Sequence, residues 1–160
     1  MIIREMSLCV LFMGKMDIVD KFCSSFCENN IQKFLSLFSE DAIYFDCLYG
    51  KFKGKNEIKN FYIKCHKEAS NYQFIPKNKI ISGNIAAFEW DFSFTSKMPY
   101  SMGKIIKVVG CSFLTLKDEK IIFYRDYSDS IFFLIQGNVP DDKILKFYKK
   151  KYSYLRGNDV

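Results

Sequence analysis

The sequence predicts one α+β domain in which a curved antiparallel sheet wraps around N-terminal helices and a further helix follows at the C-terminus. The length of 160 residues suits a single domain with a proper core. Hydrophobic residues make up 49% of the chain, which excludes an intrinsically disordered polypeptide. The apolar spacing is mostly helical before Ser70, then has a period of two, and is helical again after Pro140.

Four helices are expected from this spacing. The first begins after Asp17, a good N-cap, and ends at residues 29–30, where two asparagines break the pattern. A short second helix covers residues 31–38, and a third covers residues 58–69. The last, an amphipathic helix, opens at residues 140–142 with Pro-Asp-Asp.

Strands are expected at residues 42–47, 72–81, 88–95, 104–116 and 120–129. The third of these has an aromatic ring at every second position, so one face is a wall of rings and the other is wet. Arg125 on the last strand is expected to pair with Glu89 and Asp91 on the wet face. Residues 50–54, bounded by two glycines, are expected to form a connecting segment.

Charge and cysteine content exclude several classes of protein. The net charge is +6, and much of the excess lies in a basic C-terminal helix and tail at residues 139–160, which we interpret as a solvated helix face. No Arg-rich run is interleaved with aromatic residues, so no nucleic-acid partner is expected. The six cysteines form no C-x-x-C pair and His66 is the single histidine, expected to be exposed, so no metal site or cofactor is expected. The thiols are expected to be free in a reducing compartment, the cytoplasm.

Residues 1–15 are expected to form an extension outside the domain, either disordered or preceding a true start at Met16. The apolar run at residues 7–13 is too short to span a bilayer, so no membrane insertion is expected. It is followed by no small-residue cleavage site, so a signal peptide is not expected either. The domain proper is expected to cover residues 16–138.

Three segments carry a resemblance to a known family. They are residues 22–46, residues 54–62 (GKNEIKNFY) and residues 124–130 (YRDYSDS). Over residues 17–137 the chain resembles the nuclear transport factor 2-like superfamily, and within it the SnoaL-like polyketide cyclases, ketosteroid isomerases and limonene epoxide hydrolases. The resemblance implies a cone-shaped α+β barrel with a pocket between sheet and helices, commonly in a dimer.

The ketosteroid isomerase pattern is matched in part. Asp46 lies where those enzymes place the carboxylate that moves a proton. The two positions that stabilise the enolate there match Phe22 and Cys111, and neither can supply a strong hydrogen bond. Steroid-type isomerisation is therefore not expected.

The limonene epoxide hydrolase pattern, an Asp-Arg-Asp set, is also matched in part. Asp126 corresponds to the aspartate of the last strand, whereas the arginine and its companion aspartate are replaced by Trp90 and Phe92. Some polyketide cyclases use a single acid/base aspartate, which is compatible with Asp126 or Asp46. A purely structural role is the alternative for each residue. Asp46 would be a solvated strand end, and Asp126 would be a hydrogen-bond partner of a neighbouring tyrosine or backbone amide.

We expect a pocket for a small, largely apolar organic ligand, with Asp46 and Asp126 as catalytic acid/base groups or as ligand anchors. The expected lining residues are Phe22, Tyr44, Tyr62, Phe88, Trp90, Phe92, Cys111, Phe113 and Tyr124. Two other functions remain open: a non-catalytic carrier or sensor that uses the same pocket, and a protein-interaction module of the transport-factor type.

A homodimer is expected through the outer face of the long strands. Val108, Leu114, Leu116 and Tyr127 are assigned to that face. The helices are needed on the other side of the sheet and cannot cover it.

Overall fold

The computed structural model of the chain describes residues 17–156, and side chains as far as residue 151. The expected extension at residues 1–15 lies outside the described residues. The helices are α1 (Ile18–Cys27), α2 (Ile31–Leu35), α3 (Gly54–Glu68), α4 (Ser130–Gln136) and α5 (Asp141–Arg156). The strands are β1 (Phe38–Asp46), β2 (Gly50–Lys53), β3 (Ala69–Ser82), β4 (Ile85–Ser96), β5 (Ile105–Lys117) and β6 (Lys120–Ser128). No helix among the described residues is long and apolar enough to cross a membrane.

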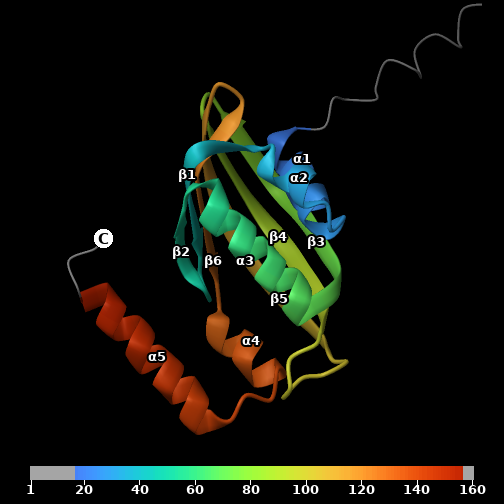
Figure 1. The fold of residues 1–160 in the computed structure, drawn as a ribbon, viewed down its shortest axis with the longest axis vertical. Helices are drawn as coiled ribbons and strands as arrows, with labels where there is room; N and C mark the ends of the chain where they lie inside the picture. The colour runs from blue at the N-terminus through green and yellow to red at the C-terminus, as the bar shows by residue number, and fades with distance from the viewer. Residues whose placement is uncertain (1–16, 157–160) are drawn as a thin grey trace, which may run out of the picture.

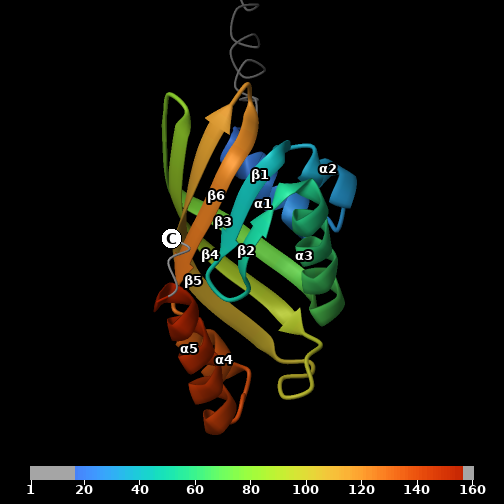
Figure 2. The ribbon, with the colours of Figure 1, turned by 60° about the vertical axis from the view of Figure 1, so that its left-hand side comes forward.

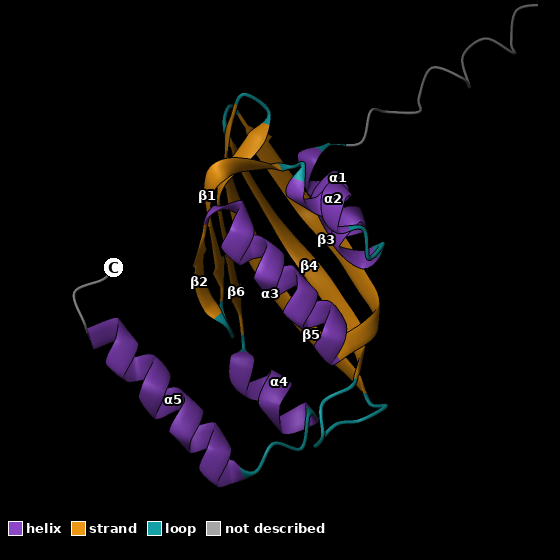
Figure 3. Cartoon of the chain, in the orientation of Figure 1, coloured by secondary structure: helices purple, strands orange, loops and turns teal. Residues whose placement is uncertain are grey.

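The strands form one curved, unclosed sheet in the order β2-β1-β6-β5-β4-β3. All neighbouring pairs are antiparallel except β1 and β6, which run parallel. Helices α1, α2 and α3 lie against one face of the sheet (Figure 1). Helices α4 and α5 lie beyond one end of it (Figure 3). The predicted α+β class, with a curved sheet wrapped around N-terminal helices and a C-terminal helix, is therefore confirmed.

The start of α1 is fixed by its cap. The Asp17 carboxylate accepts hydrogen bonds from the backbone N–H groups of Val19 and Asp20 at 2.9 and 3.0 Å, two donors that the helix itself leaves unpaired. Phe22 and Phe26 follow at helical spacing and are buried against the sheet. The predicted boundary and apolar face of this helix are confirmed.

The alternation on β4 is also confirmed, because Phe88, Trp90 and Phe94 are buried. The expected partners on the wet face are wrong. Asp91 pairs with Lys77, and Glu89 accepts a hydrogen bond from Asn78; both partners lie on β3. β5 separates β4 from β6, so Arg125 cannot reach across the sheet to either carboxylate.

The inner face of β5 is formed by its even-numbered residues. Val108 and Leu114 are 7% and 0% exposed, and Leu116 packs against the same core, so the assignment of these three residues to the outer face is wrong. Cys111 and Phe113 have the opposite parity, and Phe113 is 46% exposed. Apolar residues occupy both registers of this strand, so the pattern alone does not reveal which face is buried. Tyr127 is exposed on the outer face as expected.

Two short elements were not expected. Residues 50–53 form the edge strand β2, which pairs with β1. Helix α4 begins after Asp129, whose carboxylate accepts hydrogen bonds from the N–H groups of Ile131 and Phe132.

Candidate active site

The sheet, α3 and the C-terminal helices enclose a cavity of about 420 Å³, called the inner cavity below. Six of the expected site residues line it: Tyr44, Asp46, Trp90, Phe92, Tyr124 and Asp126. Helix α4 adds Phe133 and Leu134, and α5 adds Phe147. The walls are mainly aromatic, so the cavity fits a largely apolar molecule.

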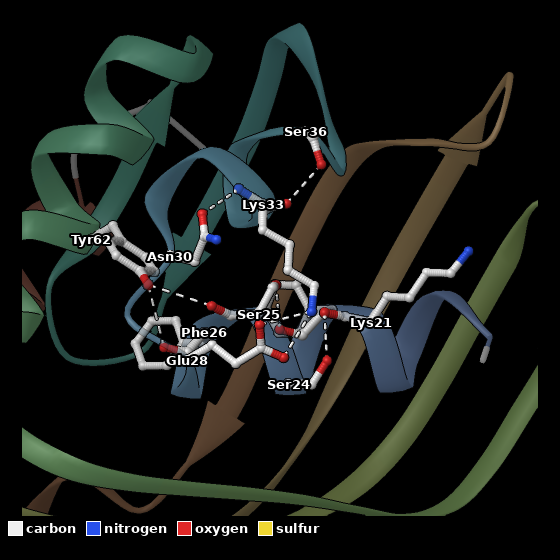
Figure 4. A network of polar contacts seen from close by, with 10 residues as sticks. Lys21, Ser24, Ser25, Phe26, Glu28, Asn30, Lys33, Ser36 and Tyr62 are labelled. Atoms are coloured by element: carbon white, nitrogen blue, oxygen red, sulfur yellow. Dashed lines mark hydrogen bonds and ion pairs between the residues drawn. The ribbon is translucent and has the colours of Figure 1, made fainter.

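Five expected lining residues lie elsewhere. Phe22, Tyr62 and Phe88 are buried in the core behind the cavity wall. The Tyr62 hydroxyl points toward the backbone carbonyls at the end of α1, at 3.4 and 3.5 Å (Figure 4). Cys111 and Phe113 are on the outer face of β5, because strand neighbours alternate between faces.

His66 was expected to be exposed, and this is wrong. Its ring packs against Tyr62, Phe26 and Tyr72, with centroid distances of 4.2, 5.4 and 4.9 Å. Burial lowers the pKa of this imidazole. The His66 ring is therefore half-buried among aromatic side chains rather than exposed to solvent.

The two carboxylates are placed by the parallel pairing of β1 and β6. Tyr44 lies opposite Tyr124 in that pair, and Asp46 and Asp126 each follow two residues later on the same face. Asp46 ends β1, and its Oδ1 accepts hydrogen bonds from the N–H groups of Leu48 and Tyr49 at 2.8 and 2.7 Å. It thus holds the turn into β2 in place.

Asp126 is 9% exposed. Its Oδ1 accepts a hydrogen bond of 2.6 Å from the N–H of Cys47, in the same turn. The side chains of Cys47 and Ser128 meet at 2.9 Å beside it. Both carboxylates therefore face the inner cavity with one oxygen each anchored to the β1–β2 turn.

The pKa values of the two carboxyl groups are raised to different degrees. Burial raises the pKa of Asp46, and the N–H groups of Tyr49 and Leu48 together with the charge of Lys151 act against the rise. Burial raises the pKa of Asp126 well above its usual range, and the negative charge of Asp46 raises it further. Both carboxyl groups therefore hold their protons to higher pH than an exposed aspartate does.

A buried chain of hydrogen bonds lies next to the carboxylates. The Trp90 indole Nε1–H donates to Ser112 Oγ at 2.8 Å, and Ser112 Oγ lies 2.9 Å from the Tyr124 hydroxyl. An indole N–H can only donate, so Ser112 accepts from it. Ser112 is fully buried, and either hydroxyl can be the donor in its contact with Tyr124. When Ser112 donates, the Tyr124 proton is available to a group in the inner cavity.

Sequence reasoning missed several residues of the site. Ser112 and Lys151 were not singled out, and neither was Tyr49, whose hydroxyl donates to Glu68 Oε2 at 2.7 Å on the cavity wall. The parity of Ser112 gave no signal, because both registers of β5 are apolar. Among the described residues no group of three or more His, Cys, Asp or Glu side chains is placed to hold a metal ion.

Comparisons with known proteins agree with this architecture. The family model of the SnoaL-like domain matches residues 19–124. A protein with a ketosteroid isomerase-like fold from Catenulispora acidiphila, in complex with trimethylamine, is 20% identical, with 78% of this chain and 95% of that chain covered and a TM-score of 0.70. A protein described as a SnoaL-like polyketide cyclase from Shewanella putrefaciens is 19% identical, with coverages of 74% and 92% and a TM-score of 0.65.

An LEH-like epoxide hydrolase from M. tuberculosis is 13% identical, with coverages of 74% and 85% and a TM-score of 0.62. At these identities the likeness shows the fold and not the reaction. A search of curated proteins gives no match. The match over residues 19–124, on a curved open sheet with helices on one face, shows that this chain belongs to the SnoaL-like domain family.

Proposed function

We propose that this protein is an acid/base enzyme that acts on a small, largely apolar organic molecule in the inner cavity, without a metal or cofactor. The observation that carries the proposal is the pair Asp46 and Asp126, which lies side by side on the wall of an apolar cavity and whose pKa values burial raises. Paired carboxyl groups in different environments can divide the roles of base and acid at one pH.

In the proposed mechanism the ionised Asp46 takes a proton from a carbon next to a carbonyl group of the substrate. The electron pair of that C–H bond moves toward the carbonyl oxygen. The Tyr124 hydroxyl donates a hydrogen bond to this oxygen as negative charge develops on it. Asp126 then gives its proton to the substrate, and a proton exchange between Asp46 and Asp126 or water restores the starting state.

This scheme fits isomerisation or cyclisation. It also accommodates epoxide opening, in which Asp46 would activate water and Asp126 would protonate the departing oxygen. Phe22 and Cys111 occupy the positions where ketosteroid isomerases place the hydrogen-bond donors to the enolate. Tyr124 would supply such a donor from another position in this chain. A carrier that only binds the same molecule is the second candidate, and the aromatic lining of the cavity favours it.

The test begins with mass-spectrometric identification of the small molecule that copurifies with the native protein. Its turnover is then measured with Asp46→Asn and Asp126→Asn, which keep side-chain size but cannot exchange a proton. We expect both variants to bind the molecule and at least one to convert it about a hundredfold or more slowly. Full turnover in both variants would make the carrier the better reading.

We further propose that the protein forms a homodimer through the outer face of its sheet and works in the cytoplasm. The outer face exposes Val109, Phe113 and Tyr127 at 68%, 46% and 51%. An apolar patch of this kind on a sheet face is typical of a protein interface. Cys23, Cys27, Cys47, Cys65 and Cys111 are unpaired, which supports a reducing compartment.

A further inference from the structure

A second hollow lies beside the inner cavity, between the β1–β2 turn, the end of β6 and helix α5. It has a volume of about 720 Å³ and is called the outer pocket below. Figure 2 shows the C-terminal end of α5 close to the turn between β1 and β2. The two hollows share the carboxylate pair, residues 47–49, Ser128 and Phe147 in their walls. A molecule held between these walls can therefore contact both.

The outer pocket differs from the inner cavity in charge. Its cationic lining residues are Lys51 from β2, Arg125 from β6, and Lys150 and Lys151 from α5. Among the described residues, the only acidic ones in its wall are Asp46 and Asp126, two against four cations. The wall therefore carries net positive charge, and positive charge concentrated in a concave site attracts an anion.

The side chain of Arg125 has a buried hydrogen-bond donor with no partner among the described residues. Its guanidinium lies over the rings of Phe45 and Phe123, 4.4 and 5.6 Å from their centroids. Its Nε is buried and has no hydrogen-bond partner among the described side chains and backbone. A buried unpaired donor is unfavourable, most of all on a charged group, so an acceptor is missing from this site.

Lys151 fixes α5 over the same site. Its Nζ donates to the Cys47 carbonyl oxygen at 2.6 Å and to Ser130 Oγ at 3.3 Å. Ser130 Oγ lies in turn 2.7 Å from the Tyr148 hydroxyl of α5. These contacts hold one ammonium group beside the carboxylate pair and close the outer pocket on the side of the helix.

We propose that the outer pocket binds the anionic group of an amphipathic organic anion whose apolar part occupies the inner cavity. Arg125 supplies the missing hydrogen bond to the anion, and Lys51 and Lys151 supply charge at its edge. The inference rests on the proposed function only for the apolar part of the ligand. It narrows the substrate class to molecules that carry an anionic group next to an apolar body.

The test uses two fluorescent probes that differ in one anionic group, 1-anilinonaphthalene-8-sulfonate and the uncharged N-phenyl-1-naphthylamine. Their dissociation constants are measured by fluorescence titration, with quenching of Trp90, the chain's single tryptophan and a residue of the inner cavity wall, as a second signal. We expect the sulfonate to bind about tenfold more tightly than the neutral probe, since a charged hydrogen bond is stronger than a neutral contact.

Variants of two of the four cationic residues in the outer pocket separate the charge contribution from the apolar one. Arg125→Gln should weaken sulfonate binding about tenfold and the exposed Lys51→Gln about threefold, while both leave the neutral probe unchanged. Arg125→Lys keeps the charge and should recover part of the loss. Lys53→Gln is the matched control, because Lys53 lies on the same strand, is also exposed and does not line the outer pocket.

Three other outcomes would contradict the inference. Equal affinity for the two probes in the wild-type chain, or equal losses for both probes in Arg125→Gln and Lys51→Gln, would overturn the inference and leave the acid/base proposal intact. Failure of both probes to bind would count against the inner cavity itself and thus against both proposals.

Discussion

Gly110 on β5 has no side chain, which leaves room for the Trp90 ring in the wall of the inner cavity. The two residues lie opposite each other in the β4–β5 pair. A Cβ added at Gly110 would lie 2.5 and 2.6 Å from the Trp90 ring atoms Cζ2 and Cη2, and it would also clash with the backbone carbonyl of Tyr127. Neither neighbour can move easily. The carbonyl belongs to a paired strand, and the indole is held by Ser112 through its N–H and packs against Phe74 at 5.6 Å.

We therefore expect Gly110→Ala to destabilise the fold. Overpacking of a core costs about 1–3 kcal/mol, and displacement of the indole would also break the hydrogen bond to Ser112, worth about 1 kcal/mol. A total of about 3 kcal/mol corresponds to a fall in Tm of roughly 6–12 °C for a domain of this size. Thermal unfolding followed by circular dichroism measures this fall, and the fluorescence of Trp90 reports the new environment of the ring.

Gly137→Ala is the control. Its φ of −72° suits any residue, and the nearest atoms to an added Cβ are 3.4 Å away, so its Tm should change little. If Gly110→Ala melted within about 2 °C of the wild type, the indole would have to move freely. In that case the argument that Trp90 and Ser112 form a fixed donor chain toward Tyr124 would fail.

Two further predictions concern pH and assembly. The pKa of Asp126 is raised in the folded state, so the native state keeps a proton that the unfolded chain loses above a pH of about 4. The contribution of this group to stability therefore falls as the pH rises from about 4 toward the folded pKa. Asp126→Asn should therefore gain in Tm relative to the wild type between pH 4 and pH 7; a difference that does not change with pH would contradict the pKa argument. For assembly, sedimentation at micromolar concentration should show a dimer. Val109→Lys on the outer face should convert it to the 18.8 kDa monomer without loss of fold, whereas a wild-type monomer would reject the dimer.

Local signals in the sequence predicted much of this fold. Asp17 and the helical spacing after it gave the start of α1, and the alternation around Trp90 gave β4 and its buried face. Helix α4 was missed because residues 131–135 are apolar throughout and show no period. The face of β5 was misassigned because both of its registers are apolar, and its true face depends on what β4 and β6 bury on either side.

The sequence predicted the two carboxylates of the site and four of its aromatic wall residues, Tyr44, Trp90, Phe92 and Tyr124. Asp46 and Asp126 share parity with Tyr44 and Tyr124, and their side-by-side position follows once β1 and β6 pair in parallel. The contact between Trp90 and Ser112 joins residues 22 positions apart in sequence, and it exists because the β4–β5 register brings Trp90 opposite Gly110, two residues before Ser112. No spacing within a single strand encodes such a contact.

The match to the family ends at residue 124, and several groups that determine the electrostatics of the site lie beyond it. Asp126 follows two residues later, and Lys151 reaches the β1–β2 turn from α5, 104 positions away from Cys47 in sequence. The matched segment supplies most of the aromatic wall residues and Asp46. The added segment supplies a second carboxyl group with a raised pKa and a cation that favours the ionised form of both. The pKa values are therefore set by both parts of the chain: burial, to which the matched segment contributes most of the wall, raises them, and Lys151 from α5, outside that segment, lowers both.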